Sequence, residues 1–308
     1  MSEPPQPKPH RLIHFTPLRY PGGKGKLTAY IKALMKENRL LDGEYVEPYA
    51  GGAAIALELL FHEYVARIHI NDVSRPVYSF WKSVLRHTEA LSKLIIDTGL
   101  TVTSWDKQKN ILEHADDHDE LALGFATFFL KRTNRSGILN GGIIGGRDQT
   151  GPWKIDARYN AAELVQRIKA IAGMGHRIKL TRQDALNFLK SGTAKWPQKT
   201  LIYIDPPYYV KGRDLYYDFY EPKDHAKVAT FITESINRQK WIVSYDNVPA
   251  IRDLYRGAPH IVYDIGYSAA KSSKQGSEVM FFGAGLVAPK LVGPITLTEN
   301  HTRQRKSA

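Results

Sequence analysis

The sequence Leu201-Ile202-Tyr203-Ile204-Asp205-Pro206-Pro207-Tyr208 joins a short apolar run to a corner that no strand can continue. The run has the length and β-branched content of a buried strand, and the two prolines end it because proline donates no hydrogen bond to a sheet. In open α/β sheets, ligands bind at the carboxyl ends of the strands. Asp205 and the Pro206 carbonyl can accept hydrogen bonds from a flat ring with an amino group, and Tyr208 can stack on that ring. The other interpretation is an ordinary turn at the end of a strand.

Strand and helix patterns alternate on both sides of this stretch. Strands are expected near residues 45–47, 67–70, 177–180, 201–204 and 241–245, with helical patterns between them. Repeated units of this kind predict a mostly parallel, doubly wound α/β sheet. We expect the α/β domain to comprise residues 13–95 and 162–286, with residues 96–161 inserted between its two parts. The proline-rich residues 1–12 and the polar, basic residues 287–308 are expected to be disordered.

The composition is that of a globular protein with an anionic partner. The chain has 308 residues, of which 43% are hydrophobic, and a net charge of +12. A positive charge of this size favours nucleic acid, although a merely basic soluble enzyme would share it. The absence of cysteine excludes disulfides, a thiolate nucleophile and a cysteine-ligated zinc site, and it agrees with a cytoplasmic location. No apolar run approaches the roughly 20 residues of a membrane span, so no membrane partner is expected.

Three loops have the residues of a nucleoside-binding site. Tyr20-Pro21-Gly22-Gly23-Lys24 precedes a helix, where free backbone N–H groups and the lysine can bind an anion. Glu47-Pro48-Tyr49-Ala50-Gly51-Gly52-Ala53 lies between a strand and a helix and lets a ligand approach the backbone. Asp72 follows the next strand, where an acid either accepts hydrogen bonds from ribose hydroxyls or caps a helix. The spacings of a phosphate-binding P-loop and of a G-x-G-x-x-G dinucleotide loop are both absent.

The sequence Arg132-Thr133-Asn134-Arg135-Ser136-Gly137 begins a long irregular segment that is rich in glycine. Residues 131–158 contain six basic residues and two acidic ones, and Arg and Asn side chains make bidentate contacts to guanine and adenine. We therefore expect this segment to contact DNA, whereas a flexible loop is the other interpretation. His114 and His118 have the i, i+4 spacing of metal ligands, but the acidic residues around them are typical of a solvated helix face. No metal site is predicted.

Taken in order, these motifs resemble the D12 class of DNA adenine-N6 methyltransferases, the α-group that contains the Dam enzymes. The resemblance extends from Arg19 to about Phe282. The segment from Tyr20 to Lys24 is similar to the family's amino-terminal cofactor motif. The segment from Glu47 to Ala53 is similar to its glycine loop, usually F-x-G-x-G, with tyrosine in place of phenylalanine and alanine in place of the second glycine. Asp205 to Tyr208 is similar to the catalytic tetrad.

The resemblance implies S-adenosylmethionine as the methyl donor, S-adenosylhomocysteine as a product and adenine N6 in double-stranded DNA as the acceptor. It implies a Rossmann-like seven-stranded methyltransferase sheet and, at residues 96–161, a mainly helical target recognition domain with a β-hairpin. The target base is expected to be flipped out of the duplex. Methylation of cytosine N4 is one alternative, and a catalytically silent DNA-binding regulator is another. A cognate restriction enzyme could accompany the protein, which is expected to be a monomer or a weak dimer.

Each motif assigns residues to a role. The implied catalytic residues are Asp205, Pro206, Pro207 and Tyr208. The implied cofactor-binding residues are Tyr20, Gly22, Gly23, Lys24, Glu47, Pro48, Tyr49, Gly51, Asp72 at the ribose, Asp184 and Ala185 near the adenine, and Asp205. The candidate base readers are Arg132, Asn134 and Arg135, because a helix end can fix their register, and the candidate phosphate contacts are Lys154 and Arg158. Lys211 is a further candidate DNA contact.

Overall fold

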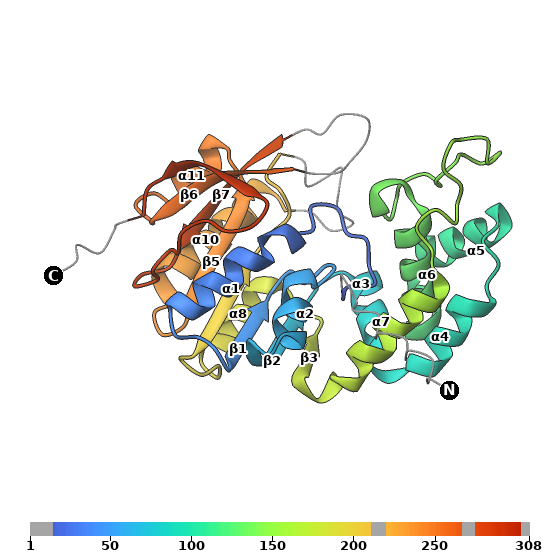
Figure 1. Cartoon of the computed structure of the whole chain (residues 1–308), viewed down its shortest axis with the longest axis horizontal. Coiled ribbons are helices and arrows are strands. Elements are labelled where there is room, and N and C mark those ends of the chain that lie inside the picture. Colours follow the sequence, from blue (N-terminus) through green and yellow to red (C-terminus); the bar gives the residue numbers. More distant parts are fainter. Residues whose placement is uncertain (1–14, 211–219, 267–274, 303–308) are drawn as a thin grey trace, which may run out of the picture.

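A computed structural model of the chain describes residues 15–210, 220–266 and 275–302 and shows one mixed β-sheet with helices on both faces (Figure 1). The strand order is β3-β2-β1-β4-β5-β7-β6-β8. The strands are β1 (Gly43–Glu47), β2 (Val65–Asn71), β3 (Ile178–Thr181), β4 (Thr200–Ile204), β5 (Lys240–Asp246), β6 (His260–Gly266), β7 (Gln275–Phe282) and β8 (Ile295–Asn300). The predicted α/β class is confirmed.

The first five strands are parallel and the last three are not. β1 pairs with β2 and with β4, β2 with β3, and β4 with β5, all in parallel. β7 is antiparallel to both β5 and β6, and β8 is antiparallel to β6. Because the chain moves outward from β1 in two opposite directions, the sheet has a switch point between β1 and β4, which is where open α/β sheets bind ligands.

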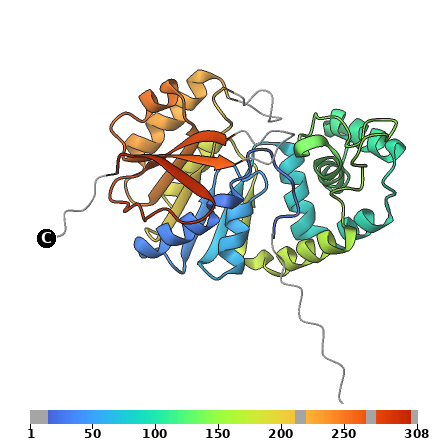
Figure 2. The ribbon, with the colours of Figure 1, turned by 45° about the horizontal axis from the view of Figure 1, so that its top comes forward.

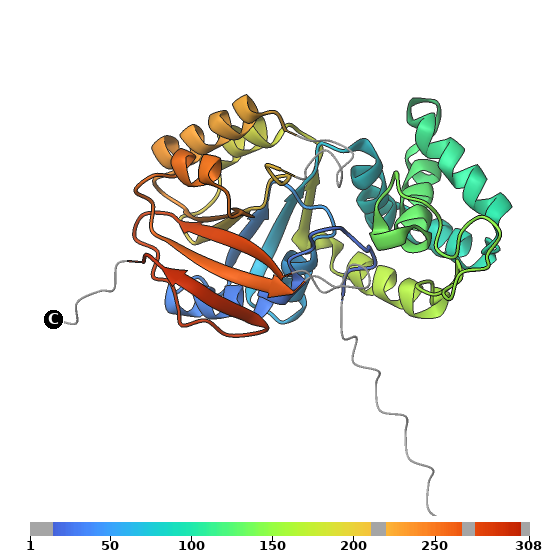
Figure 3. The ribbon, with the colours of Figure 1, turned by 90° about the horizontal axis from the view of Figure 1, so that it is seen from above.

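Helices cover the two faces of the sheet, as Figure 3 shows from above. One face carries α1 (Thr28–Glu37) and α2 (Ala54–Phe61), and the other carries α8 (Ala185–Thr193), α10 (Pro222–Ser235) and α11 (Pro249–Leu254). Successive side chains of β4 point to opposite faces, so Leu201 and Tyr203 pack into one core while Ile202 and Ile204 pack into the other. A strand buried on both faces explains why the run before Asp205 is continuously apolar.

A helical lobe lies beside the β3 edge of the sheet (Figures 1 and 2). It contains α3 (Arg75–Arg86), α4 (Thr88–Asp97), α5 (Val102–Glu113), α6 (Glu120–Thr133) and α7 (Ala161–Gly173). Its core is continuous with that under α1 and α2, and it includes Phe80 and Phe128, whose rings stack with centroids 6.0 Å apart. Four short 3-10 helices complete the described helices: Gly25–Leu27, Ala115–Asp117, Arg135–Gly137 and Gly175–Arg177.

The prediction of a β-hairpin within residues 96–161 is wrong. This segment is fully described, and its only strand-like feature is an isolated bridge between Asn134 and Ile143. Glycines in the left-handed region turn the chain repeatedly, among them Gly145 at φ +89° and Gly146 at φ +81°. Such turns leave no run long enough for a ladder.

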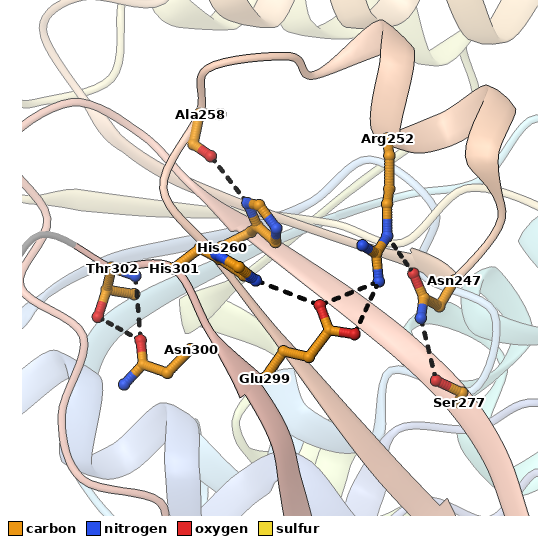
Figure 4. Close-up of polar contacts among 9 residues, drawn as sticks. All are labelled: Asn247, Arg252, Ala258, His260, Ser277, Glu299, Asn300, His301 and Thr302. Carbon is orange, nitrogen blue, oxygen red and sulfur yellow. Dashed lines mark hydrogen bonds and ion pairs between the residues drawn. The ribbon is translucent and has the colours of Figure 1, made fainter.

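Two further predictions are corrected: a sheet of seven strands, and disorder throughout residues 287–308. Residues 295–300 form an eighth strand of the sheet. The alternation Ile295-Thr296-Leu297-Thr298 is typical of an edge strand, and the polar residues around it hid that signal. Figure 4 shows how side chains secure this strand. Glu299 forms an ion pair with Arg252 of α11 at 3.3 Å and a hydrogen bond with His301 Nε2 at 3.2 Å, and the His301 ring stacks on His260 of β6 with centroids 4.5 Å apart.

The helices of the described residues include none that is long and apolar enough to cross a membrane. The predicted arm at residues 1–12, the basic residues 303–308 and the candidate DNA contact Lys211 lie outside the described residues.

Candidate active site

A cavity of about 550 Å³ opens where β1, β2 and β4 end. The amino-terminal segment, the glycine loop, the start of α3 and the end of α6 complete its wall. The lining residues that carry the argument are Tyr20, Lys24, Glu47, Tyr49, Asp72, Lys131, Asp205 and Tyr220. Parallel strands bring their carboxyl ends to one edge of a sheet, so loops that are far apart in sequence meet there. The loops of Lys24 and Asp72 meet at this cavity together with Asp205, whereas Asp184, whose loop was expected to share the same pocket, is not among the lining residues.

The glycine loop approaches Tyr20 so closely that only glycine fits. Gly51 has φ +46°, and a Cβ built there would lie 2.7 Å from the Tyr20 ring. The Gly51 carbonyl accepts a hydrogen bond from Trp81 Nε1 at 2.9 Å. Ala53, which occupies the position of the family's second glycine, also has a left-handed backbone with φ +46° and ψ 34° at the start of α2. The alanine is thus held in a conformation that favours glycine.

Asp72 ties the glycine loop to α3. Its Oδ2 accepts a hydrogen bond from the Gly51 backbone N–H at 2.9 Å, and its Oδ1 accepts one from the Ser74 N–H at 3.0 Å. Ser74 is the N-cap residue of α3, so the carboxylate satisfies a helix-end donor while it also lines the cavity. The two interpretations of Asp72, as a helix cap and as a ligand contact, are therefore compatible in this geometry.

Asp205 lies in a network of buried polar groups. The Lys24 ammonium is 3.0 Å from Asp205 Oδ1, and the Ser244 hydroxyl donates to the same oxygen at 2.7 Å. Lys24 is also 3.5 Å from Glu278 Oε1, and Glu278 is only 2% exposed. The Asp205 side chain keeps 22% of its surface accessible, which is the highest exposure of the three charged groups. One cation thus contacts two carboxylates, and Asp205 is the carboxylate that reaches the cavity.

Tyr208 is held from two sides. Its hydroxyl donates a hydrogen bond to Glu278 at 2.8 Å and accepts one from Lys24 at 3.3 Å. The Lys24 ammonium also lies 4.8 Å from the centre of its ring. Tyr263 of β6 donates a second hydrogen bond to Glu278 at 2.8 Å. Pro207 lines the cavity beside Asp205, whereas Pro206 and Tyr208 do not, so stacking of Tyr208 on a base stays a prediction.

Burial changes the acidity of two cavity carboxyls. The pKa of Asp205 is raised by desolvation; Lys24 opposes this rise and Glu278 adds to it. Desolvation also raises the pKa of Glu47 to about 8, although hydrogen bonds from the Tyr45 hydroxyl and the Ala56 N–H oppose the rise. Lys24 and, to a smaller extent, the hydrogen bond from Ser244 therefore favour the charged form of Asp205.

The other predicted cofactor residues divide into two groups. Gly22, Gly23, Glu47, Tyr49 and Gly51 line the cavity. Pro48, Asp184 and Ala185 are not among the lining residues: the Pro48 carbonyl accepts a hydrogen bond from Asn71, Asp184 is the N-cap of α8, and Ala185 is buried. Their predicted contacts with the cofactor stay predictions.

The prediction that Asn134 reads a DNA base is corrected, because its side chain does not reach the surface. Its side chain is fully buried, accepts a hydrogen bond from Trp105 Nε1 at 2.6 Å and donates to the carbonyls of Ile138 and Leu139. The amide therefore holds the chain after α6 and presents no edge to solvent. The side chain of Arg132 is largely enclosed and donates to the Pro17 carbonyl at 2.7 Å, while Arg135, Lys154 and Arg158 are exposed.

Three residues of the site were missed in the sequence: Ser244, Glu278 and Lys131. Glu278 stands next to the apolar run Val279-Met280-Phe281, and Lys131 follows the apolar segment of α6. A charged residue beside an apolar run is a weak signal for a buried functional group. Ser244 carries no such signal. Among the described residues there is no group of three or more acidic, histidine or cysteine side chains that could hold a metal ion.

A mixed sheet with a glycine loop and a partly buried acid at its carboxyl edge belongs to the class of open α/β proteins, which bind ligands at that edge. Within that class, the model of the family described as D12 class N6 adenine-specific DNA methyltransferase matches residues 20–137. The match confirms the resemblance over this segment and supports a methyltransferase enzyme. It ends before Asp205, so the tetrad lies outside the matched segment.

Comparisons of the chain with curated proteins and with solved structures find only low similarity. No curated protein matches the chain. Among solved structures, a putative methyltransferase yhhF from Escherichia coli has 9% sequence identity and a TM-score of 0.31, with 79% of this chain and 77% of that chain covered. A precorrin 8W decarboxylase, the product of gene MT0146 of Methanobacterium thermoautotrophicum, has 11% identity and a TM-score of 0.35, with 84% and 89% covered. At these TM-scores neither likeness carries an inference about this chain.

Proposed function

We propose that the protein transfers a methyl group from S-adenosylmethionine to N6 of a flipped-out adenine in double-stranded DNA. The observation that carries the proposal is the Asp205 carboxylate. It lies at the wall of the cavity, at the end of β4, and it is fixed by Ser244 at 2.7 Å and Lys24 at 3.0 Å. An acceptor that is partly buried and held in a fixed orientation suits a substrate amino group.

The residues around the cavity fit S-adenosylmethionine. The cavity volume of about 550 Å³ falls within the roughly 300–1,000 Å³ of ordinary ligand sites. Gly51 and Gly52 would allow close approach to the loop backbone, Asp72 would accept hydrogen bonds from ribose hydroxyls, and Tyr49 and Tyr220 offer aromatic surface for the adenine. When bound, this cofactor would supply an activated methyl group on its sulfonium. The family match to residues 20–137 supports this choice.

Asp205 and the Pro206 carbonyl would position the substrate amino group. The N6 lone pair of adenine is delocalised into the ring, which makes the nitrogen a poor nucleophile. Two acceptors on its hydrogens favour the tetrahedral form, in which the lone pair can point at the methyl group. Lys24 would favour the ionised form of Asp205 for this role. A base within a duplex cannot reach a cavity, so it would be flipped out, and Tyr208 is the proposed stacking residue.

DNA would be bound by the positive surface of the chain, whose net charge is +12. We propose that residues 96–161, including the exposed Arg135, Lys154 and Arg158, act as the target recognition domain. Alanine variants at these three positions should separate two kinds of contact. Loss of a base reader should cost about 1–3 kcal/mol at one position of the site, whereas loss of a phosphate contact should weaken all sequences alike. Methylation of every single-base variant of the site is the measurement.

Asp205→Ala is the direct test of the proposed function. Loss of the acceptor should lower the single-turnover rate by at least about 10²- to 10⁴-fold, the usual contribution of a positioned acid or base. DNA affinity should change little, because no phosphate contact is lost. Asp253→Ala, which removes an exposed acid of α11, is the control. Methylation by Asp205→Ala at the wild-type rate would reject the assignment.

Asp72→Ala tests the cofactor contact separately. The affinity for S-adenosylmethionine should fall by about 1–3 kcal/mol in calorimetry, because buried polar groups lose a partner. Asp119→Ala is a matched control, since Asp119 caps α6 by accepting from the Ala122 N–H at 2.8 Å and does not line the cavity. If both variants lose stability but keep the wild-type affinity, Asp72 is a helix cap only.

Long-read modification mapping of DNA from cells that express the protein identifies both the base and the sequence. N6-methyladenine at one recurring sequence is the expected result. N4-methylcytosine would replace the proposed substrate by the alternative amino-bearing base. The absence of any modified base from cells in which the protein is folded and binds DNA would favour the catalytically silent regulator.

A further inference from the structure

Lys131 is a buried lysine that the proposed reaction does not yet use. It lies in the last turn of α6, directly after Phe128, Phe129 and Leu130, which are fully buried. Only 3% of Lys131 is exposed, and the residue lines the same cavity as the glycine loop. Lysines are almost never this buried unless a partner compensates for the loss of water.

The described residues supply little compensation for the burial of Lys131. The Lys131 ammonium lies 4.0 Å from the centre of the Tyr20 ring, but no carboxylate of the described residues is within 4 Å of it. Asp72 acts on it electrostatically, yet both Asp72 oxygens already accept backbone N–H groups, from Gly51 and Ser74. Lys24 is the contrasting case, because it is equally buried but lies within 3.5 Å of two carboxylates.

The environment of Lys131 is suited to an anion that arrives with a ligand. A cation near a helix carboxyl terminus interacts favourably with the helix dipole. Desolvation lowers the pKa of Lys131 to about 7, and the charge of Asp72 opposes this change. An anion placed beside the amine would complete its compensation and raise the pKa again.

We propose that Lys131 binds the α-carboxylate of S-adenosylmethionine, an inference that rests on the proposed function. The methyl donor carries two cationic groups, the sulfonium and the ammonium, and a single anionic group, the carboxylate. A lysine that faces the cavity would repel the first two and attract only the third. The almost complete burial of Lys131 places it out of reach of the phosphates of a bound duplex. It is thus a positioning residue for the donor, contributed by the helix that precedes the basic segment.

Calorimetry with a matched pair of ligands tests this inference on the full chain. S-adenosylmethionine and decarboxylated S-adenosylmethionine share the sulfonium and differ in the carboxylate. The wild type should bind the first about 10- to 100-fold more tightly, the ratio expected for a charged hydrogen bond. Lys131→Met should bind both ligands alike. Lys107→Met, which removes an exposed lysine of α5 that does not line the cavity, should keep the wild-type ratio.

Proton uptake is a second and independent readout. At pH 8 the amine should take up a proton when the carboxylate binds, so the binding enthalpy of S-adenosylmethionine should depend on the ionisation enthalpy of the buffer. Lys131→Met should lose this dependence. The variant should melt at or above the wild-type temperature, because it removes a buried charge; if it does not fold, Lys131→Gln takes its place.

The outcomes distinguish failure of the proposed function from failure of the proposed role of Lys131. A wild type that binds neither ligand would reject both the proposed function and the role of Lys131. A wild type that binds both ligands equally, or a Lys131→Met protein that keeps the wild-type ratio, would reject only the role of Lys131. A Lys131→Met protein that loses affinity for duplex DNA, with unchanged affinity for both ligands, would also reject it, since the lysine would then bind phosphate.

Discussion

The charge of Asp205 depends on two neighbours that act in opposite directions, and a pair of substitutions can reverse their balance. Lys24 lowers the pKa of Asp205 and Glu278 raises it. Lys24→Met should therefore raise that pKa further, and Glu278→Gln should lower it. Glutamine has the shape of glutamate; its oxygen can accept from one of the two hydroxyls, of Tyr208 and Tyr263, and its amide nitrogen can donate to the other, so the second change removes charge with little change in shape.

The magnitudes follow from the distances. Among the described residues, the wild-type cluster has one positive and two negative groups when all are ionised, a net charge of −1; Glu278→Gln makes it 0 and Lys24→Met makes it −2. At an effective dielectric constant of about 20, each of the two Lys24 ion pairs, at 3.0 and 3.5 Å, is worth about 5 kcal/mol before desolvation. Breaking a buried pair usually costs about 3–5 kcal/mol of folding free energy. Lys24→Met should therefore lose about 3–5 kcal/mol of folding free energy near pH 8. Glu278→Gln should lose less folding free energy, because the ion pair between Lys24 and Asp205 remains.

The pH dependence of the single-turnover methylation rate is the assay, with saturating donor and a duplex that contains the mapped site. The Asp205 carboxylate acts only when ionised, so the rate should be highest above its pKa and fall about tenfold per pH unit below it. The acidic limb of the profile should move to higher pH in Lys24→Met and to lower pH in Glu278→Gln. Urea denaturation across the same pH range verifies that both proteins are folded at every point.

Two results would contradict this reasoning. If both variants move the acidic limb in the same direction, the limb reports loss of structure rather than the charge of Asp205. If neither variant moves it while both fold, Asp205 is not the group that titrates. Tyr263→Phe is a matched control, because it removes a hydrogen bond to Glu278 and leaves every charge of the cluster in place.

Three further predictions concern stability. Asn134→Ala should destabilise the protein by about 2–3 kcal/mol in urea denaturation, because buried groups lose their partners, whereas Asn140→Ala, at an exposed position, should have little effect. Ala53→Gly should change stability by less than about 0.5 kcal/mol, since relief of the left-handed backbone offsets the flexibility of glycine, whereas Ala56→Gly within α2 should cost about 1 kcal/mol or more. The pKa of Glu47 is raised from 4.5 to about 8, so the folded state retains a proton that the unfolded chain releases. The free energy of unfolding should therefore decline as the pH rises from about 4.5 to 8. Glu47→Gln should remove this part of the decline.

The sequence was sufficient for the features that depend on local order. The apolar run before Asp205 is a strand buried on both faces, and the two prolines end it at the edge where Asp72 and the glycine loop also lie. Parallel pairing brings these segments to one edge whatever their distance in sequence, so alternation of strands and helices was enough to predict their meeting. The eighth strand was missed because polar residues surround its short alternating pattern, and an edge strand needs little apolar surface.

The role of Asn134 could not be read from its neighbours. An Asn between basic residues after a helix is equally suited to reading adenine and to closing a turn, because the same amide makes both kinds of hydrogen bond. What decides is burial: Trp105 of α5 covers the side chain, and that contact joins residues 29 positions apart. Arg135, one residue later, is exposed. Adjacent residues with similar recognition chemistry therefore have different surroundings, which only the tertiary structure determines.

The network around Asp205 shows why long-range pairing matters for the chemistry. Lys24 comes from the segment before α1, Asp205 from the end of β4 and Glu278 from β7, the strand that lies between β5 and β6. Because β7 runs antiparallel to β5, Glu278 pairs with Asp246 at the carboxyl end of β5 and so stands at the same edge as Asp205. A parallel strand in that position would bring a different residue to this edge. The antiparallel β7 thus supplies the second carboxylate, and with it the need for a buried lysine that holds two acids at once.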